Sequence, residues 1–471
     1  MKTTKKALCI LLAVLSILSC CSVMSFAESK SYVIKNPYQD VIWEGEGAYG
    51  AYKGNLHTHS FVSDAQVDYR DMILEYYNQG FDFLAMTDHA VTGKPWNQKP
   101  TMLPLYLYQL IIGNKVHYFT DEEYEAIQNG TFKVNGVERG YGMVDVYGGN
   151  ELNGLTLTKD HVNGLFLPEG VGDNYLGFEN DHEGAVKLVD DAGGLSFINH
   201  PGDWMQSNSD RANCSKPENI QYFGNILLKY DSCLGIEVFN EHNGPTGYDR
   251  DTWDNLLMYC LPYGKDVIGF SNGDTHYLRD VDSSFSVFMM KENTLENIKK
   301  TMQTGAFFAV TKAIRKDELI HGPEEDLDAR IDLDNPDDKG RIEPRFTNIV
   351  VDGHKITVTF NRTYDLRWVA NGKVIAKANY DKVDNALENT QTYTIDLDEI
   401  ENSDEFLYVR CQLIGEGGVT LTQAFVIDDG TEKPEYVEDT SFKAVAKEAL
   451  RKFLSLRIFV LIKIIYDAIA G

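Results

Sequence analysis

The fold is decided by the stretch Phe81-Asp82-Phe83-Leu84-Ala85-Met86-Thr87-Asp88-His89. Its first six residues are mainly apolar and predict a buried strand, which ends where the polar residues begin. The same order, an apolar strand followed by a polar cluster, recurs at residues 195–201 and 267–276, and residues 71–79 and 181–192 have helical periodicity. Strands that alternate with helices predict a parallel α/β sheet or barrel, with its functional site at the carboxyl edge of the strands.

The second half of the chain follows a different pattern. Residues 316–345 are acidic and poor in apolar side chains, which is the composition of a linker. From residue 346 to residue 430 the apolar positions recur with a period of two, and turns are predicted at Asp352-Gly353 and Asn371-Gly372. This pattern predicts a small all-β domain of the sandwich type.

The first 27 residues predict export. Three lysines (Lys2, Lys5 and Lys6) precede an apolar run over residues 7–18, and Ser25-Phe26-Ala27 offers the small residues that a signal peptidase recognises. The apolar run is shorter than the roughly 20 residues that a membrane span needs. We therefore expect a signal peptide over residues 1–27 and an extracellular or cell-surface protein. A lipoprotein acylated at Cys20 or Cys21 stays open.

The C-terminal segment, residues 443–471, predicts an amphipathic helix. Its aliphatic residues lie on one face, and Lys452, Arg457 and Lys463 lie on the other. This pattern suits contact with a membrane surface, with a partner or with the protein's own surface. A spanning helix is disfavoured because Arg457 and Lys463 would fall in the middle of the span.

Net charge limits the class of partner. The formal charge of the full sequence is −27, and removal of the three lysines in residues 1–27 would make it more negative. Such a field repels nucleic acid, so general nucleic-acid binding is not expected. An acidic surface also keeps an exported protein soluble.

The strongest chemical signal is Asn55-Leu56-His57-Thr58-His59, which Ser63-Asp64 follows. Two histidines at i and i+2 on a strand project in the same direction, so they can reach one metal ion or two adjacent ions. Five of the eleven histidines lie in this and similar clusters, more than scatter would place there. The other clusters are Asp88-His89, Glu151, His200 and Asp274-Thr275-His276. Imidazole with carboxylate is the ligand set of Zn, Mn or Fe in hydrolases, and several carboxylates can bridge two or three ions.

The ordered set HTH, SD, TDH, GNE, NHP and GDTH resembles the PHP (polymerase and histidinol phosphatase) family of metal-dependent phosphoesterases, over residues 55–312. The resemblance implies an α/β fold, a distorted seven-stranded (β/α) barrel, which we expect over residues 45–315. It also implies a centre of two or three divalent metal ions. The ligands that it implies are His57, His59, Asp64, His89, Glu151, His200, Asp274 and His276. Glu237 and Asn240 could also face the site, at a strand end where the family often has a histidine.

Three residues, Asp88, His200 and Asp274, are expected to act in catalysis. Asp88 is expected to orient a histidine rather than to bind metal. Cations at this edge would lower the pKa of a bridging water toward neutrality from roughly 15.7, and the resulting hydroxide would attack phosphorus. Two other histidines are set aside: His161 is interpreted as structural, and His242 has the wrong offset from its strand.

The leading functional hypothesis is hydrolysis of a phosphate mono- or diester in a small phosphorylated substrate. Two alternatives stay open, a metal-dependent amide or ester hydrolase and a cell-surface binding protein with a vestigial site. Residues 103–149 are interpreted as an insertion, with a helix over residues 121–128 that Thr120 caps and a hairpin at Asn135-Gly136.

Overall fold

The computed structural model describes residues 31–101, 116–153, 159–173, 181–207, 209–241, 248–312, 340–380 and 390–441, and isolated residues between 445 and 453. The expected signal peptide (1–27), most of the expected acidic linker (316–345) and nearly all of the expected C-terminal helix (443–471) lie outside the described residues. In the described part of the chain, no helix is long and apolar enough to cross a membrane.

The first strands and helix of the α/β region hold the segment that decides the fold. Strand β2 (Gly50–Asn55) is parallel to β3 (Phe83–Leu84), and β3 is parallel to β6 (Val144–Asp145). Helix α2 (Tyr69–Asn78) lies between β2 and β3 in sequence and buries Met72, Ile73 and Tyr76. The ladder of β3 is shorter than the strand expected over residues 81–86, although the Ala85 and Thr87 amides still donate to the backbone oxygens of Asn55 and Thr58.

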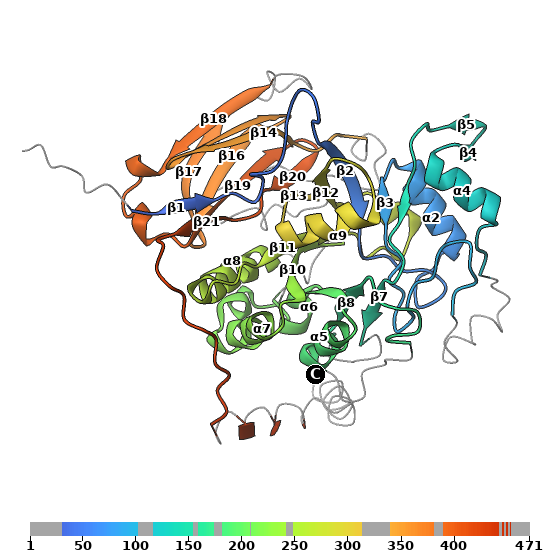
Figure 1. Ribbon diagram of the computed structural model, residues 1–471, viewed down its shortest axis with the longest axis horizontal. Coiled ribbons are helices and arrows are strands. Elements are labelled where there is room, and N and C mark those ends of the chain that lie inside the picture. Colours follow the sequence, from blue (N-terminus) through green and yellow to red (C-terminus); the bar gives the residue numbers. More distant parts are fainter. Residues whose placement is uncertain are drawn as a thin grey trace, which may run out of the picture.

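A second sheet contains five strands in the order β11-β10-β9-β8-β7. These strands are β7 (Asn150–Leu152), β8 (Val162–Leu165), β9 (Leu195–Ile198), β10 (Cys233–Asn240) and β11 (Ile268–Asn272). Strands β9, β10 and β11 are parallel as expected, whereas β7 and β8 are antiparallel to their neighbours. Helices α5 (His182–Asp191), α7 (Pro217–Lys229) and α8 (Asp249–Cys260) cover its outer face (Figure 1), and the short helix α6 (Pro201–Met205) follows β9.

The inner faces of the two sheets share an aromatic core. Phe83 and Phe288 from the first sheet pack in one cluster with Phe197 and Phe270 from the second. Strands β12 (Ser284–Met290) and β13 (Phe307–Thr311) complete the first sheet around β2, and α9 (Leu295–Thr304) adds Ile298 and Met302 to the same core. This packing accounts for the almost continuous apolar character of the central strands.

The expected barrel is not confirmed, since the described strands do not close into one. Among the described residues, isolated parallel bridges from Thr58 to Thr275 and from His89 to Glu151 link the two sheets. Both bridges lie at the carboxyl edge of the strands, where ligand-type residues interrupt the ladders. On the other side the first sheet continues into the C-terminal region, because β13 pairs with β20 (Gly418–Leu421) rather than curling back.

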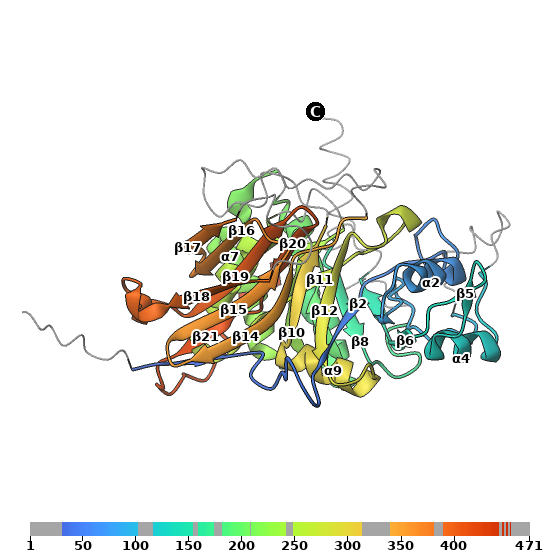
Figure 2. The ribbon, with the colours of Figure 1, turned by 90° about the horizontal axis from the view of Figure 1, so that it is seen from above.

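The C-terminal region therefore shares a sheet with the α/β region (Figure 2). Beyond β20 this sheet continues through β19 (Tyr408–Gly415), β21 (Phe425–Asp428) and β1 (Val33–Lys35). Strand β19 also pairs with β16 (Asp365–Ala370), which in turn pairs with β17 (Lys373–Asn379). A separate sheet holds β14 (Arg345–Asp352), β15 (Lys355–Asn361) and β18 (Gln391–Asp396). Ile356 and Phe360 of that sheet pack in one core with Leu366, Trp368 and Leu413, so two sheets face each other.

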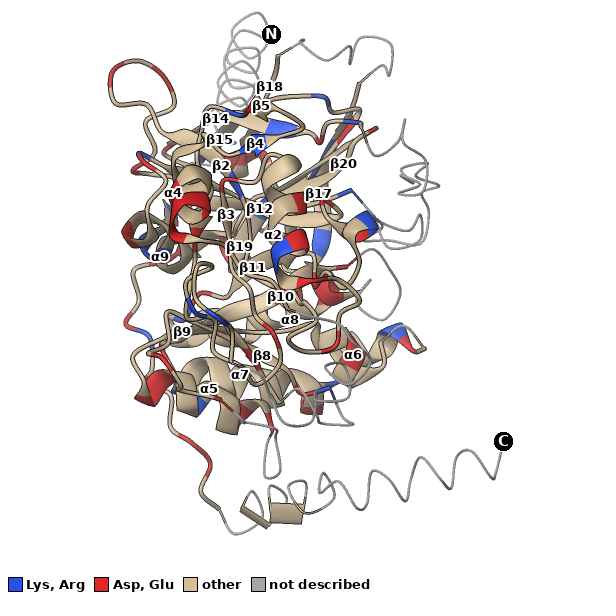
Figure 3. Ribbon diagram, turned by 90° about the vertical axis from the view of Figure 1, so that its right-hand side faces the viewer, with Lys and Arg blue, Asp and Glu red and all other residues tan. Residues whose placement is uncertain are grey.

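The described part of the 103–149 insertion matches its expected helix and hairpin. Helix α4 (Asp121–Asn129) begins at Thr120, whose hydroxyl accepts a hydrogen bond from the Glu123 amide in a capping box. Its first turn carries three acidic residues, favourable at a helix N-terminus and visible in Figure 3. Strands β4 (Lys133–Val134) and β5 (Val137–Glu138) join through Asn135-Gly136, both with positive φ, as a two-residue hairpin requires.

A buried ion pair fastens the C-terminal strands to the helices of the α/β region. Arg410 of β19 donates to both carboxylate oxygens of Asp254 of α8, each at 2.8 Å, and the Tyr408 hydroxyl donates to Asp254 Oδ1 at 2.6 Å. Both side chains of the pair are fully shielded from water. Removal of one partner would leave the other charge buried without compensation.

We predict that Arg410→Ala lowers the free energy of unfolding by about 3–5 kcal/mol, because Asp254 loses its bidentate partner inside the protein. Urea denaturation of the full chain measures this loss. The control is Lys35→Ala, which breaks the exposed Lys35–Asp428 pair and should cost less than about 1 kcal/mol. Equal effects of the two substitutions would contradict the fastening role of Arg410.

Candidate metal centre

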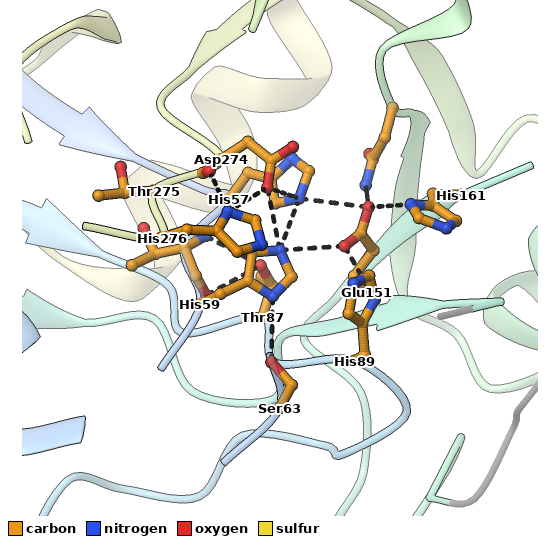
Figure 4. Close-up of polar contacts among 12 residues, drawn as sticks. His57, His59, Ser63, Thr87, His89, Glu151, His161, Asp274, Thr275 and His276 are labelled. Carbon is orange, nitrogen blue, oxygen red and sulfur yellow. Dashed lines mark hydrogen bonds and ion pairs between the residues drawn. The ribbon is translucent and has the colours of Figure 1, made fainter. Parts of the chain in front are cut away.

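Ligand-type side chains from several strand ends converge at the carboxyl edge where the two sheets meet (Figure 4). His57 and His59 follow β2, His89 follows β3, and Asp274 and His276 follow β11. Glu151 lies within β7, His161 directly precedes β8, and His200 follows β9. Four groups have ligand atoms within 4.8 Å of one another: His57, His59, Glu151 and Asp274; His59, Asp64 and His89; His89, Glu151 and His161; and Glu241, Asp274 and His276.

Glu151 lies at the middle of the cluster and is 1% exposed. Its Oε1 lies 3.0–3.4 Å from ring nitrogens of His57, His161 and His200. Its Oε2 lies 3.0 Å from ring nitrogens of His59 and His89. The two oxygens thus face different sets of histidines, which is the arrangement of a carboxylate that bridges two cations.

Asp274 joins the histidines of the first motif. Its Oδ1 lies 3.2 Å from His57 Nε2 and 3.1 Å from His59 Nε2, and those two nitrogens are themselves 3.1 Å apart. With Glu151, these atoms surround one buried point with two imidazole nitrogens and two carboxylates. The donor set and its spacing fit a divalent transition-metal ion.

Asp64 and His276 form the more open side of the cluster. Asp64 is 43% exposed, and its oxygens lie 3.3 Å from His89 Nε2 and 3.4 Å from His276 Nε2. His276 Nδ1 donates to the backbone oxygen of Asp274 at 2.7 Å, which leaves Nε2 as the ring nitrogen available to a metal. Asp64 forms a ligand group with His59 and His89, and His276 forms one with Asp274 and Glu241, so both residues belong to the candidate metal centre.

The buried carboxylates of the cluster change the pKa values of its histidines. Burial would lower the pKa of His57, but the carboxylates of Asp274 and Glu151 raise it well above its ordinary value. At His200 burial also acts to lower the pKa. The hydrogen bond to Glu151 and the charge of Asp274 outweigh it and raise the pKa to about 9. At His161 burial prevails and the pKa is lowered. The raised pKa values of His57 and His200 favour protonated rings paired with carboxylates when no metal is bound, and a cation would displace those protons.

Several residues of the site have strained backbone conformations. His200, Asp274 and Glu241 have φ values of 24°, 43° and 49°, in the left-handed region that side chains other than glycine rarely adopt. Each of them follows a strand of the second sheet, so the chain turns sharply where the ligand-type side chains must point inward. Such strain persists only where the surrounding structure enforces it, and it gathers at functional sites.

Glu237 and Asn240, expected to face the site, lie behind the histidines and belong to none of the four groups among the described residues. Glu237 accepts from His57 Nδ1 at 2.9 Å and from the His200 amide at 3.0 Å. The side-chain amides of Asn240 and Asn272 also donate to it, at 2.7 and 2.9 Å. Glu237 is thus occupied in orienting His57, with Nε2 directed at the cluster, and Asn240 supports Glu237.

Asp88, expected among the catalytic residues, also lies outside the four groups. It accepts from the amides of Ser60 and Ser63 at 2.7 and 3.1 Å and from the Ser63 hydroxyl at 2.7 Å. The Ser63 hydroxyl oxygen in turn lies 3.2 Å from His59 Nδ1. Asp88 therefore holds the loop after His59 and orients that ring through Ser63.

Two residues of the cluster were missed by sequence reasoning. His161 was interpreted as structural, yet its Nδ1 lies 3.0 Å from Glu151 Oε1. The antiparallel hairpin of β7 and β8 brings it there, since Leu152 pairs with Val162, and recognition of that hairpin would have revealed it. Glu241, between Asn240 and His242, is the second residue that sequence reasoning did not select. It forms a ligand group with Asp274 and His276. Burial, together with the charge of Asp274, raises its pKa to about 7. His242 lies outside the described residues.

Comparisons with known proteins give only distant likenesses. No family model and no curated protein matches the chain. A two-domain protein from Bacteroides vulgatus ATCC 8482, said to contain a predicted PHP-like metal-dependent phosphoesterase, is 16% identical, with 80% of this chain and 96% of that one covered and a TM-score of 0.39. An amidohydrolase from Chromobacterium violaceum is 16% identical over 47% of this chain and 87% of its own, with a TM-score of 0.25. A candidate metal-dependent phosphoesterase from Bifidobacterium adolescentis ATCC 15703 is 13% identical over 48% and 90%, with a TM-score of 0.27. At TM-scores this low, none of these likenesses says anything about the function of this chain.

We predict that Zn²⁺ binding to the metal-free protein at pH 8 releases protons, because the raised pKa of His200, about 9, keeps that ring protonated until a cation displaces its proton. The apparent affinity should therefore rise as the pH increases from 6 to about 9. Titration in weak buffer with a pH indicator measures the release, and His200→Ala should release about one proton fewer. Binding without proton release, or affinity that falls with rising pH, would contradict the prediction.

Proposed function

We propose that this chain is a metal-dependent hydrolase that cleaves a phosphate mono- or diester of a small substrate. The observation that carries the proposal is Glu151, a buried carboxylate whose two oxygens face two separate sets of histidines beside Asp274. Buried charges of this kind are retained where they bind metal or do chemistry. The order of the sequence motifs, which resembles that of the PHP family, supports the same assignment.

Two or three divalent ions, Zn, Mn or Fe, would be held by the overlapping groups. One ion would use His57, His59, Glu151 and Asp274; a second would use Glu151 with His89 and His161, next to His200; and a third would use Asp274 with Glu241 and His276. When bound, such ions polarise phosphoryl oxygens and acidify a coordinated water.

The chain's own residues would orient the centre. Glu237 holds the His57 ring through Nδ1, and Ser63 contacts His59 Nδ1, so both rings direct Nε2 at the cluster. Asp274 Oδ2 and His200 Nε2 lie 3.8 Å apart, so the two residues expected in catalysis face the same part of the cluster without a direct hydrogen bond. Asp274 is 8% and His200 is 4% exposed, so both act in a site largely shielded from water.

The phosphate ester is favoured over an amide by the number of ligand groups. Three neighbouring cation sites can contact several oxygens of one phosphoryl group and offset the charge that develops during in-line displacement. An amide has one carbonyl oxygen to polarise, which one or two ions suffice to do. Export to the extracellular space or cell surface is proposed from residues 1–27, and contact of residues 443–471 with a membrane surface from their amphipathic pattern.

We predict that the purified protein contains two or three divalent ions per chain and hydrolyses p-nitrophenyl phosphate or its bis-ester. His59→Ala should lower kcat/KM by about 1000-fold or more, because His59 belongs to two of the ligand groups. Elemental analysis and steady-state kinetics measure both quantities. His117→Ala is the matched control, since that ring is 64% exposed and contacts Asp68 away from the cluster.

Each result distinguishes the proposed reaction from its alternatives. Bound metal with turnover that is lost in His59→Ala and kept in His117→Ala supports the phosphoesterase. Bound metal without turnover of either phosphate ester refutes it and favours amide or ester hydrolysis. If the wild type binds no metal and the Asp274→Ala variant behaves as the wild type does, only the binding role remains.

A further inference from the structure

Two segments of the site repeat one pattern. The pattern is asparagine, any residue, a ligand-type residue, threonine and histidine. It occurs in Asn55-Leu56-His57-Thr58-His59 and again in Asn272-Gly273-Asp274-Thr275-His276. Each asparagine is the last residue of its strand, β2 or β11. Each segment supplies two ligand-type side chains, and the two sets must meet at common points although they come from different sheets.

The two asparagines hold the segments together reciprocally. Asn55 Oδ1 accepts from the Gly273 amide at 3.0 Å, and Asn272 Oδ1 accepts from the Leu56 amide at 2.9 Å. Both asparagines are fully buried. One step further along, the His59 amide donates to the Thr275 oxygen at 3.1 Å within the Thr58–Thr275 bridge. These contacts set the register between the two segments.

Tyr76 of α2 lies at the midpoint of the pair. Its hydroxyl accepts from Thr58 Oγ1 at 3.2 Å and from the Asn55 side-chain amide, so its own proton is left for Thr275 Oγ1, 2.6 Å away. The ring is 1% exposed. The space around the hydroxyl is filled: a Cβ at Gly273 would lie 2.4 Å from Thr275 Oγ1 and 3.2 Å from Tyr76 Oη, which accounts for the glycine in the second segment.

We infer that Tyr76 is a positioning residue of the metal centre, whose hydroxyl joins Thr58 and Thr275 and thereby sets the spacing between the two ligand-bearing segments. This role rests on the metal-binding part of the proposed function. His57 and His59 come from one segment and Asp274 from the other, yet their ligand atoms lie 3.1–3.2 Å apart around one point. Ligand distances at a metal hold within about 0.2 Å, so a shift between the segments would weaken binding without removing a ligand.

The test is Co²⁺ binding to the full-length, metal-free chain, followed by visible absorption. Tyr76→Phe should bind Co²⁺ about 10- to 100-fold more weakly and give an altered absorption spectrum, because the ligands no longer meet at the right spacing. The matched control is Tyr77→Phe on the same helix, whose hydroxyl donates to the Phe132 oxygen at 3.4 Å and contacts no ligand. Tyr77→Phe should keep the affinity and the spectrum of the wild type.

A second pair of variants keeps the role testable if Tyr76→Phe does not fold. Thr275→Val removes the hydroxyl that Tyr76 contacts, and Thr275→Ser retains it, so weak Co²⁺ binding should appear in the first and be rescued in the second. The inference would be overturned if Tyr76→Phe kept the Co²⁺ affinity and the spectrum of the wild type, or if the two Thr275 variants bound Co²⁺ equally well. It would also be overturned if the wild type bound no Co²⁺. A wild type that binds Co²⁺ but cleaves no phosphate ester refutes the proposed reaction alone.

Discussion

The structure depends on the compensation of charge around Glu151, a carboxylate buried among five histidine rings. A lone carboxylate there would be too costly to bury, so the fold must bring cationic partners to it from several strand ends. Protonated imidazoles meet that need in the metal-free chain, and cations would meet it in the loaded one. His200 and Asp274 lie at left-handed turns, and the reciprocal hydrogen bonds of Asn55 and Asn272 hold together the two segments that carry His57, His59, Asp274 and His276.

The described strands do not close into a barrel at the carboxyl edge, where the ligand-type side chains converge. The two sheets instead meet there through single bridges at Thr58 and His89, and the aromatic core between them provides the cohesion. The C-terminal strands stabilise the opposite side by extending the first sheet through β13 and β20, and the buried pair of Arg410 and Asp254 ties them to the helices.

The sequence predicted the parts that depend on local pattern. Helix α4 with its cap at Thr120 and strand β9 with its polar end at His200 could be recognised because each lies within one short window. The pairing of β13 with β20 could not, since it joins residues more than a hundred positions apart and leaves no local signature. His161 was missed for a different reason: its place beside Glu151 comes from an antiparallel pairing of two strands that are close in sequence, in a region for which the pattern predicts parallel strands. Asp88 carries the residue type of a ligand, and only the three-dimensional contacts with Ser60 and Ser63 show where its carboxylate is engaged.

Glu151 belongs to two ligand groups, one with His57 and His59 and one with His89 and His161, so two cations would share its carboxylate. The most direct measurement is an anomalous difference map from crystals grown with Mn²⁺, collected on either side of the manganese absorption edge. This arrangement predicts separate peaks on the two sides of the Glu151 carboxylate, one toward His57 and His59 and one toward His89 and His161. A map with no peak within bonding distance of Glu151, in a protein shown to be folded and saturated with Mn²⁺, would contradict it.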